Sequence, residues 1–554
     1  MSNISFLLKA FSGHLDSNQL QAFRDIEPDD KTRKLIQRFL GVQKEYSATY
    51  LDEKGVIPPE AMERLREIGF FGLNIPAEFG GVGLNIWQYL KVVEEIVSQN
   101  MSLGFTALAH LSIGIKGIVL FGTDAQKKKY LPLAASGEMI FSYALTEPDR
   151  GSDAQNIETT ATLSADGRHY ILNGRKTYIT NANYAGGLTV FAQMNPDEPG
   201  FMGAFVVETG WKGVNIGKDM PKMGLKASST AAIQFKNVKV PVDNLLGRAG
   251  DGFKIAMTIL NYGRLALGAG SSGMMDQSLA DMKKRTASRT QFDVPINRFE
   301  LIQEMLVHAR VNGYIASAIT AFTASMLAAD PLAVVAIESS HSKLFGTTRA
   351  WDTLYDALQV AGGAGYLATL PYEMRMRDFR VTTIFEGTTE IHSIYPALFV
   401  IRRLAKELQG LSGNKIKSAI YLLKNAFKPM RWQLRFNQTD MDRALRVART
   451  NARRVNLLVH AGLFVYGAKI FRQEFLLRRI TDLSLRMYGI LAALARIDAT
   501  RKTGQKVSDD IDLLNYFVEE SKQARRCSTA IFPSRKERLN KKIASIIIAS
   551  RPEF

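Results

Sequence analysis

The sequence predicts an α+β protein that is mostly helical. Three observations favour this class: helical periodicity over residues 30–136, strand periodicity after Met139, and helical periodicity again from Gly252. At 554 residues, the chain is long enough for several domains. We expect an N-terminal arm, a helical domain, a middle β-domain, a second helical domain and a helical extension, over residues 1–30, 31–140, 141–245, 246–408 and 409–554.

The first helical domain contains the helical segments Arg33–Leu40 and Trp87–Val97, with a glycine-rich loop at residues 76–83 between them. In the β-domain, Asn173-Gly174 lies between two short apolar runs, which predicts a β-hairpin. Strand patterns follow at residues 188–194, 201–209 and 231–240, and Pro241 ends the domain.

Residues 268–273 read GAGSSG, which matches the glycine fingerprint of dinucleotide-binding folds. That fingerprint works only where a strand leads into a tight turn and a helix. Residues 256–267 have helical periodicity instead. We therefore interpret these small residues as a site of close helix packing.

The composition is that of a globular protein, with 46% hydrophobic and 22% charged residues. The single cysteine, Cys527, excludes an intrachain disulfide, and no two of the seven histidines have a metal-ligand spacing, so we expect no metal site. No run of about 18 apolar residues predicts a membrane span. The N-terminal residues do not resemble a targeting peptide, so we expect a cytoplasmic, bacterial-type chain.

The positive charge is concentrated in the extension. Residues 405–554 contain 30 Lys and Arg against 13 Asp and Glu, whereas residues 1–404 contain 41 against 40. Such an asymmetry indicates a polyanionic partner, either a lipid surface or nucleic acid.

One stretch of this extension combines basic with apolar side chains. The basic residues are Lys415, Lys417, Lys424, Lys428, Arg431 and Arg435, and the apolar ones are Ile416, Ile420, Leu423, Phe427, Met430 and Trp432. On one continuous helix the apolar residues would form a face typical of interfacial helices. We therefore favour peripheral binding at the cytoplasmic side of a membrane, while a helix packed on its own domain and a DNA-binding surface stay open.

The stretch RDFRVTTIFEGTTEIH, residues 377–392, contains the best candidate for a catalytic residue. Glu386 precedes Gly387, Thr388 and a segment of helical periodicity, so it would lie just before a helix. A desolvated carboxylate there would have a raised pKa, which suits a general base. An ordinary acid ahead of a helix is the alternative.

Two further motifs suggest a cofactor. Residues 143–153 form a polar loop able to hold a polar cofactor, and Arg289-Thr290-Gln291-Phe292 places a cation beside an aromatic ring, as a pyrophosphate site would. Both are also compatible with ordinary surface loops.

The motifs taken together identify a family. The succession LTEPDRGSD, LNGRKTYITN, MGLKASSTAAIQFKNVKVP, LNYGR, SRTQF, LQVAGGAGY and MRDFRVTTIFEGTTEIH resembles the acyl-CoA dehydrogenases over residues 30–408. The basic extension, including QEFLLRR at residues 473–479, resembles that of the very-long-chain members. The resemblance implies a helical domain, a β-domain and a four-helix bundle, followed by an extra helical domain.

The resemblance also implies that FAD is bound without a Rossmann fingerprint. Tyr178 stands where many members have tryptophan. Arg289, Phe292 and residues 359–363 would contact the FAD of a partner subunit, which implies a homodimer. The residues implied in FAD binding are Tyr143, Leu145, Thr146, Ser152, Tyr178, Thr180, Arg289, Phe292, Gln359, Gly362, Gly363, Thr388 and Glu390.

The implied reaction is α,β-dehydrogenation of an acyl-CoA in fatty acid β-oxidation. Glu386 would remove the α-proton and the flavin would accept the hydride, with electrons passing to an electron-transferring flavoprotein. Some members carry the base beside the arginine of LNYGR, but residues 260–264 contain no acid here. The implied substrate-binding residues are Ser152, Asn261, Arg264 and Gly387.

A long or very long acyl chain is inferred mainly from the extension. Gly104 and Ala107 favour a deep acyl channel, whereas Phe105 and Leu108 would shorten it. Three alternatives stay open: a DNA-binding flavoprotein of the alkylation response, an assembly factor on the same fold, and an acyl-CoA oxidase.

Overall fold

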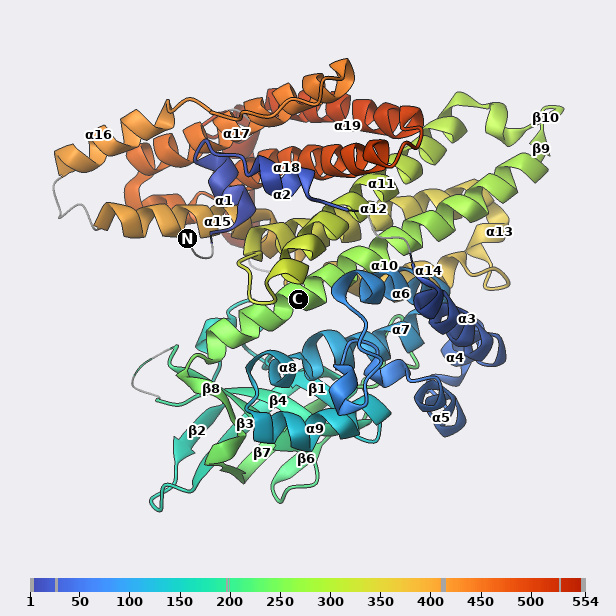
Figure 1. Cartoon of the computed structure of the whole chain (residues 1–554), viewed down its shortest axis with the longest axis vertical. Helices are drawn as coiled ribbons and strands as arrows, with labels where there is room; N and C mark the ends of the chain where they lie inside the picture. The colour runs from blue at the N-terminus through green and yellow to red at the C-terminus, as the bar shows by residue number, and fades with distance from the viewer. Residues whose placement is uncertain are drawn as a thin grey trace. The chain divides into compact units, whose positions relative to one another are not determined.

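The computed structural model describes residues 4–24, 28–195, 198, 200–409, 415–527 and 530–549. It divides into two compact units (Figure 1). The larger unit is Ile26–Thr389, and the smaller combines Met1–Asp25 with Glu390–Phe554. The α+β class with a majority of helix is confirmed.

The larger unit begins with helices that cover one side of the β-domain. Asn85 caps α6 through a reciprocal pair of hydrogen bonds with Gln88, and Thr123 caps α9 in the same way. A π-helical segment, Ala109–Gly114, follows α7. The helices are α3 (Asp30–Glu45), α4 (Ala48–Lys54), α5 (Pro59–Glu67), α6 (Ile86–Gln99), α7 (Met101–Leu108), α8 (Lys116–Phe121) and α9 (Asp124–Ser136).

The β-domain is one sheet with the order β6-β7-β3-β2-β4-β5-β8, and β1 pairs in parallel with β4. Alternating side chains such as Leu172, Val190, Phe205 and Ile233 form its core. The strands are β1 (Ile140–Ala144), β2 (Thr160–Leu163), β3 (His169–Thr180), β4 (Ala185–Gln193), β5 (Met202–Glu208), β6 (Val214–Ile216), β7 (Thr230–Pro241) and β8 (Leu245–Gly250).

The predicted hairpin at Asn173-Gly174 is wrong. Both residues lie inside the continuous strand β3, which pairs with β2 on one side and β7 on the other. The ladder with β7 shifts register between Leu172 and Gly174, where β7 has one extra residue, so Asn173 lies opposite a bulge in β7. A Cβ atom at Gly174 would lie 2.5 Å from the Thr159 hydroxyl, so close packing also requires glycine there.

Long helices complete the larger unit: α10 (Gly252–Ser288), α11 (Glu300–Ala329) and α12 (Ala336–Ala361), followed by α13 (Gly363–Tyr366) and α14 (Tyr372–Phe379). A short hairpin, β9 (Thr290–Gln291) with β10 (Val294–Pro295), connects α10 to α11. The GAGSSG stretch lies within α10, as predicted. A Cβ atom at Gly268 would lie 2.1 Å from the Ser342 hydroxyl of α12, and one at Gly273 would lie 2.0 Å from the Glu94 carbonyl of α6.

Two helical stretches, Met101–Phe121 and Glu300–Ala329, are long and apolar enough to cross a bilayer by length and composition alone. Their most apolar windows are 83% and 78% buried within the protein. We interpret them as core helices of the larger unit.

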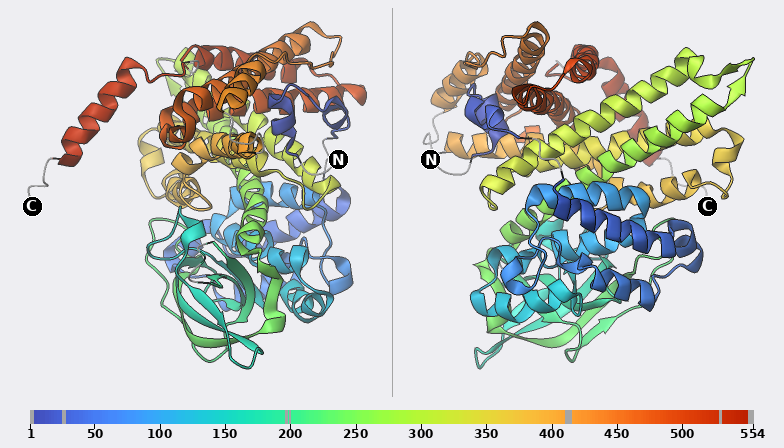
Figure 2. Two further views of the ribbon diagram at one scale, coloured as in Figure 1. Left: turned by 90° about the vertical axis from the view of Figure 1, so that its left-hand side faces the viewer. Right: turned by 45° about the vertical axis from the view of Figure 1, so that its right-hand side comes forward.

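The smaller unit is helical. It comprises α1 (Phe6–Phe11), α2 (Ser17–Gln21), α15 (Thr389–Gln409), α16 (Lys415–Ala426), α17 (Thr439–Tyr466), α18 (Glu474–Lys502), α19 (Ser508–Cys527) and α20 (Arg535–Ala549). The segment we expected as an N-terminal arm forms α1 and α2, which pack on α17 and α18. Helix α15 falls almost wholly in this unit. Figure 2 shows α20 extending away from the unit's other helices.

The continuous helix expected from Lys415 to Arg435 is wrong. Helix α16 ends at Ala426, and the chain then runs without helix to Gln438. Residues 431–436 alternate between exposed and buried, as in an extended chain, and Trp432 is on the buried side with 4% of its surface exposed. The exposed apolar face is therefore confined to α16 and the residue that follows it.

Candidate active site

Glu386 lies in a turn between the 3-10 helix Arg380–Thr383 and α15. Its backbone is left-handed, with φ 54°, and Gly387 follows with φ 100°. The turn places the Glu386 carboxyl against α10, where a Cβ atom at Gly263 would lie only 2.4 Å from Oε2. Oε2 itself is buried. The carboxyl can occupy this place only because residue 263 has no side chain.

Two cations oppose the effect of burial on this carboxyl. Burial raises the pKa of Glu386 to about 7, against the positive charges of Arg264 and Lys343. The charge of Glu386 also acts on Tyr89 of α6 and Tyr143 of β1, whose pKa values are raised mainly by burial. A carboxyl with a pKa near neutrality is suited to take up a proton at physiological pH.

Arg264 is oriented by a short hydrogen-bond chain. Its Nη1 donates to Asn261 Oδ1 (3.4 Å), and the same oxygen accepts a hydrogen bond from the Ser339 hydroxyl of α12 (2.8 Å). All three side chains are buried. Two residues predicted to bind substrate, Asn261 and Arg264, are thus joined to each other and lie near the predicted base.

Lys343 is a residue of this site that the sequence analysis missed. It is fully buried on α12, and its Nζ donates to the carbonyl oxygen of Gly387 (2.7 Å). One feature of the sequence could have indicated Lys343: it is a lysine within ESSHSKLFG, a helical stretch of small and apolar residues. Tyr89 was also missed; its hydroxyl lies 2.6 Å from that of Ser112 in the π-helical segment.

The neighbouring apolar wall comes from α7. The rings of Phe105 and Phe385 lie 5.5 Å apart, which places Phe105 next to the turn that carries Glu386. Gly104 instead faces α6, because a Cβ atom there would lie 3.1 Å from a methyl group of Val97. Gly104 therefore allows close helix packing, and Phe105 is an α7 side chain that contacts Phe385, the residue before the base.

A second group of predicted residues gathers where β1 leaves the sheet beside β3. The Thr177 N–H donates to the Thr146 carbonyl (2.9 Å), and the Ser142 hydroxyl donates to the Thr180 carbonyl (2.8 Å). These bonds bring Tyr143, Leu145 and Thr146 alongside Tyr178 and Thr180. Tyr143 in turn donates to the Ala256 carbonyl of α10 (3.2 Å).

A buried ion pair fixes the backbone of this segment. Lys176 Nζ donates to Glu147 Oε1 (2.7 Å) and to the Leu145 carbonyl (3.1 Å). Glu147 also accepts the backbone N–H groups of Glu158 and Thr159. Burial opposes ionisation of Glu147, yet Lys176 and these donors lower its pKa. The segment from Leu145 to Glu147 is thereby attached to β3.

Of the remaining predicted residues, Thr388 lies in the turn of Glu386. Ser152 is exposed in the loop after β1, Thr388 directly precedes α15, and Glu390 is in the first turn of α15. Arg289, Phe292, Gln359, Gly362 and Gly363 lie where α10 and α12 end, at the opposite end of α10 from β8 (Figure 1). Because α10 has 37 residues, its ends are about 55 Å apart. One chain therefore does not bring these five residues to its own Tyr178.

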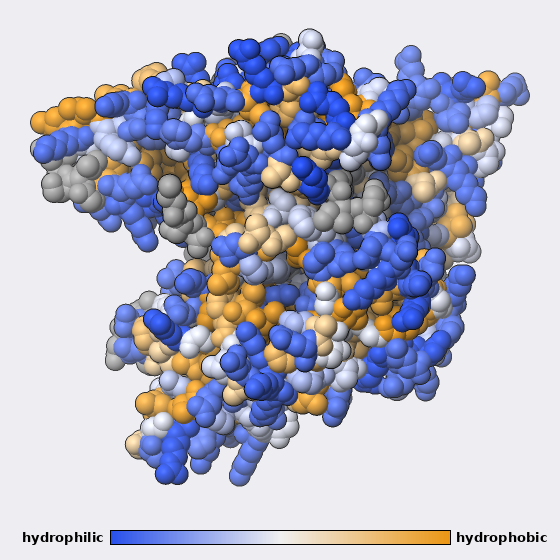
Figure 3. All heavy atoms as spheres, in the orientation of Figure 1, coloured by the Kyte–Doolittle hydropathy of each residue, from blue (hydrophilic) through white to orange (hydrophobic). Residues whose placement is uncertain are grey.

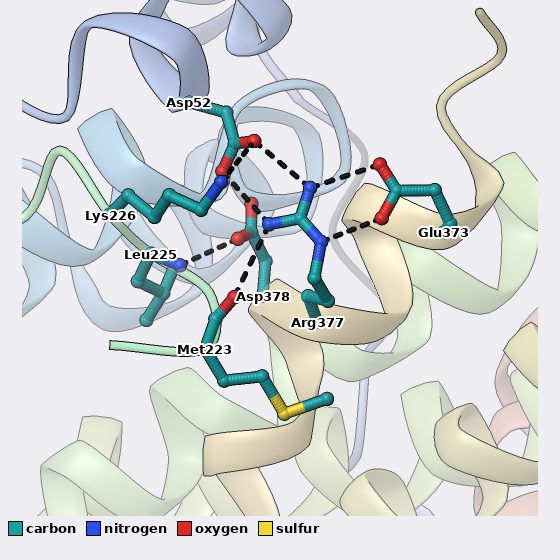
Figure 4. Close-up of polar contacts among 7 residues, drawn as sticks. All are labelled: Asp52, Met223, Leu225, Lys226, Glu373, Arg377 and Asp378. Carbon is teal, nitrogen blue, oxygen red and sulfur yellow. Dashed lines mark hydrogen bonds and ion pairs between the residues drawn. The ribbon is translucent and has the colours of Figure 1, made fainter. Parts of the chain in front are cut away.

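Charged residues from three parts of the larger unit fix α14, which leads towards the turn of Glu386 (Figure 4). Arg377 Nη2 donates to Asp52 Oδ2 of α4 (2.9 Å), and Lys226 Nζ lies 3.1 Å from the same oxygen. Asp378 accepts the Leu225 N–H (2.6 Å), and burial raises the pKa of Asp378 to about 6.

Comparisons with known proteins agree with this arrangement. Models of the N-terminal, middle and C-terminal domains of acyl-CoA dehydrogenases match residues 27–138, 142–238 and 250–395. A very long-chain specific acyl-CoA dehydrogenase of Bos taurus is 34% identical over 554 residues, which covers 95% of this chain and 84% of that protein. The chain belongs to the acyl-CoA dehydrogenase family. The resemblance inferred from the motifs is confirmed.

Two solved structures are similar to this acyl-CoA dehydrogenase. The acyl-CoA dehydrogenase of Bacillus anthracis complexed with FAD has a TM-score of 0.82 at 28% identity, over 98% of this chain and 96% of that chain. Butyryl-CoA dehydrogenase of Megasphaera elsdenii has a TM-score of 0.64 at 30% identity, over 68% of this chain and all (100%) of its own. The predicted fold is confirmed, and the first structure also has a counterpart for the extension.

Acyl-CoA dehydrogenases use FAD, and this acyl-CoA dehydrogenase is an FAD-dependent enzyme. The residues present fit that cofactor. Tyr178 is 67% exposed and held at φ 56°, at a register shift of β3, so an aromatic plane stands open beside the fixed segment at Thr146. A strained and exposed aromatic residue is typical of a binding site.

Proposed function

We propose that this enzyme oxidises long-chain acyl-CoA thioesters to trans-2-enoyl-CoA in fatty acid β-oxidation, with Glu386 as the base. The observation that supports this most is the buried Glu386 carboxyl, whose burial raises its pKa to about 7 between Arg264 and Lys343. When bound, FAD would accept the hydride from the β-carbon. Glu386 would take the α-proton, Arg264 would stabilise the carboxylate, and Phe105 would exclude water beside it.

Long chains are favoured by the extension. The similarity to the Bos taurus relative runs through the extension, whereas the butyryl-CoA dehydrogenase covers 68% of the chain. A lipid-facing extension would suit substrates that partition into membranes. Membership of the family supports an electron-transferring flavoprotein as the electron acceptor.

A homodimer would complete the flavin site. Arg289, Phe292 and the segment from Gln359 to Gly363 share one end of α10 and α12, where Arg285 Nη2 donates to the Ala361 carbonyl (3.3 Å). Apolar side chains at this end are exposed, including Phe292 at 88% and Tyr366 at 81%. A second copy that covers these side chains would receive Arg289 near its own flavin.

We also infer peripheral attachment of the smaller unit to the cytoplasmic side of a membrane. Ile416, Ile420, Leu423 and Phe427 recur at helical spacing and are exposed, and Figure 3 shows apolar atoms over α16. Lys417, Lys424 and Lys428 lie among them. Helix α20 repeats this pattern with Leu539, Ile543 and Ile546 exposed between basic residues. Such helices bind lipid surfaces by combining apolar insertion with charge.

The decisive test is anaerobic mixing of the purified yellow enzyme with palmitoyl-CoA. We expect bleaching of the flavin absorbance, and bleaching slower by about 10²–10⁴-fold in Glu386→Gln, because general-base removal typically costs this much. The matched control is Glu78→Gln, a change at an exposed glutamate. Bleaching of Glu386→Gln at the wild-type rate would contradict the assignment of the base. Faster bleaching by butyryl-CoA than by palmitoyl-CoA would contradict the chain length.

A further inference from the structure

Lys343 is an unusual residue for the middle of a buried helix. It is fully buried on α12 among Ser342, Leu344 and Phe345, which are also buried. A buried ammonium group is costly unless it is paired or hydrogen-bonded. The contact described for its Nζ is with the Gly387 carbonyl at 2.7 Å, and its charge also acts on the Glu386 carboxyl.

The peptide that Lys343 contacts belongs to the turn of the base. Glu386 and Gly387 both have left-handed backbones, at φ 54° and φ 100°. A non-glycine residue in this region is strained and persists only where its surroundings fix it. The hydrogen bond from Lys343 holds the carbonyl of the Gly387–Thr388 peptide, one peptide beyond that of Glu386, so it restrains the turn that carries the Glu386 side chain.

The groups that face the Glu386 carboxyl come from four elements: Arg264 of α10, Lys343 of α12, Tyr89 of α6 and Tyr143 of β1. Both phenols are neutral at physiological pH, and burial raises their pKa values further. Arg264 Nη1 donates to Asn261 Oδ1 within α10. Among these groups, Lys343 alone combines a positive charge with a described hydrogen bond to the turn.

We propose that Lys343 is a positioning residue for the base, which holds the Glu386–Gly387 turn in place and supplies positive charge that favours the ionised form of the carboxyl. This proposal rests on the proposed function, because Lys343 can position a base only if Glu386 is the base. The hydrogen bond and the charge are separable, since different substitutions remove one or both.

The test is the pH dependence of anaerobic flavin bleaching by palmitoyl-CoA in three variants. Lys343→Met removes both donor and charge, Lys343→Gln can keep a donor, and Lys343→Arg keeps the charge. For Lys343→Met and Lys343→Gln we expect the ascending limb of the profile to move by about one pH unit to the alkaline side, since loss of a nearby cation disfavours the carboxylate. Lys343→Arg should keep the wild-type limb.

The plateau rate above the limb separates the two roles. Lys343→Met should be slower there by about tenfold or more, since a misplaced base stays slow after ionisation. Lys116→Met is the matched control, because Lys116 of α8 is also buried but lies over the Tyr262 ring, 5.0 Å from its centroid. It should leave the limb in place. If Lys343→Met does not fold with its flavin, the shift of the ascending limb is measured in Lys343→Gln instead.

An unmoved limb in a folded, flavin-containing Lys343→Met or Lys343→Gln variant would overturn the proposal. The same is true if Lys116→Met moves the limb equally. The Glu386→Gln variant distinguishes this failure from failure of the proposed function. If Glu386→Gln is inert and the limb of Lys343→Met is unmoved, only the role of Lys343 is rejected. An active Glu386→Gln rejects the base and with it the role of Lys343.

Discussion

Gly263 and Glu386 form a pair in which one missing side chain makes room for another. Oε2 of Glu386 would lie 2.4 Å from a Cβ atom at residue 263, well inside contact distance. Glu386 is also held at φ 54°. The position of the carboxyl therefore depends on α10 as much as on its own turn, and a single methyl group at Gly263 would displace it.

We predict that Gly263→Ala lowers the rate of flavin bleaching by about 10²-fold or more, because a displacement of about 1 Å at a reacting group can cost that much. The variant should keep its FAD, since Gly263 is not among the residues beside Tyr178. Gly41→Ala in α3 is the control, because no atom lies within 4 Å of a Cβ atom there. A Gly263→Ala enzyme as fast as wild type would show that the carboxyl reacts from another position.

Glu386 was predicted as the base from the family resemblance of its stretch, since its acid, turn glycine and helix start alone also fit an ordinary acid ahead of a helix. Lys343 and Tyr89 could not be predicted in the same way. Their proximity to Glu386 depends on how α12 and α6 pack against α10, and on glycines such as Gly273 that allow close approach. Residues that support a base from other helices have no signature in their own stretch of sequence.

Among the structural elements, β3 fixes the segment from Leu145 to Glu147, which we expect to lie beside the flavin. Lys176 and Thr177 attach Leu145 and Thr146 to the sheet, and the Glu147 carboxylate neutralises the buried Lys176. A buried pair of this kind contributes little net stability compared with apolar residues, but removal of one partner leaves a buried charge. The pair thus sets the geometry of the segment.

We predict that Glu147→Gln destabilises the enzyme by about 3–5 kcal/mol, since Lys176 then lacks its counter-charge, and weakens FAD retention. The double variant Glu147→Leu with Lys176→Met should recover part of the melting temperature, since the N–H groups of Glu158 and Thr159 still lack their acceptor. It should still lose FAD, because the Leu145 carbonyl has lost its donor. Thermal melting and flavin content after ultrafiltration measure the two effects. Full FAD retention in the double variant would show that the ion pair does not position the segment.

The helical regions and the strands β4, β5 and β7 followed from periodicity, including the helical reading of GAGSSG. Two elements did not. Asn173-Gly174 is a hairpin signal, but β3 continues because β2 and β7 pair with it on both sides. The apolar residues after Phe427 have helical spacing, but residues 431–436 alternate in burial, which suits an extended chain. In both cases tertiary contacts overrode a local pattern.

At the scale of the whole molecule, the proposals concern exposed surfaces. The end of α10 and α12 presents Phe292 and Tyr366, which we assign to a second copy of the chain. The smaller unit instead presents α16 and α20, where apolar side chains alternate with basic ones. The Arg479 guanidinium pairs with Glu537 (2.5 Å), which attaches the start of α20 to α18 and leaves its apolar residues exposed.

We predict that the enzyme sediments with anionic liposomes, less so at high salt, and that the triple variant of Ile420, Leu423 and Phe427 to Ser sediments markedly less. These side chains are exposed, at 59%, 48% and 67%, so their replacement should leave the fold and the flavin intact. Trp432 is excluded because it is buried. Each basic residue near the lipid contributes about 1 kcal/mol. Once the apolar face of α16 is lost, charge and the exposed apolar residues of α20 give only weaker binding.

The matched control replaces Val56, Leu163 and Leu332, which are exposed apolar residues of the larger unit, by Ser. This control should still sediment. Sedimentation of the α16 triple variant at the wild-type level would contradict the assignment of α16 to lipid. If the wild type also bound duplex DNA more tightly than liposomes, we would assign the basic extension to nucleic-acid binding. Phosphate contacts need the lysines and arginines but not the apolar face.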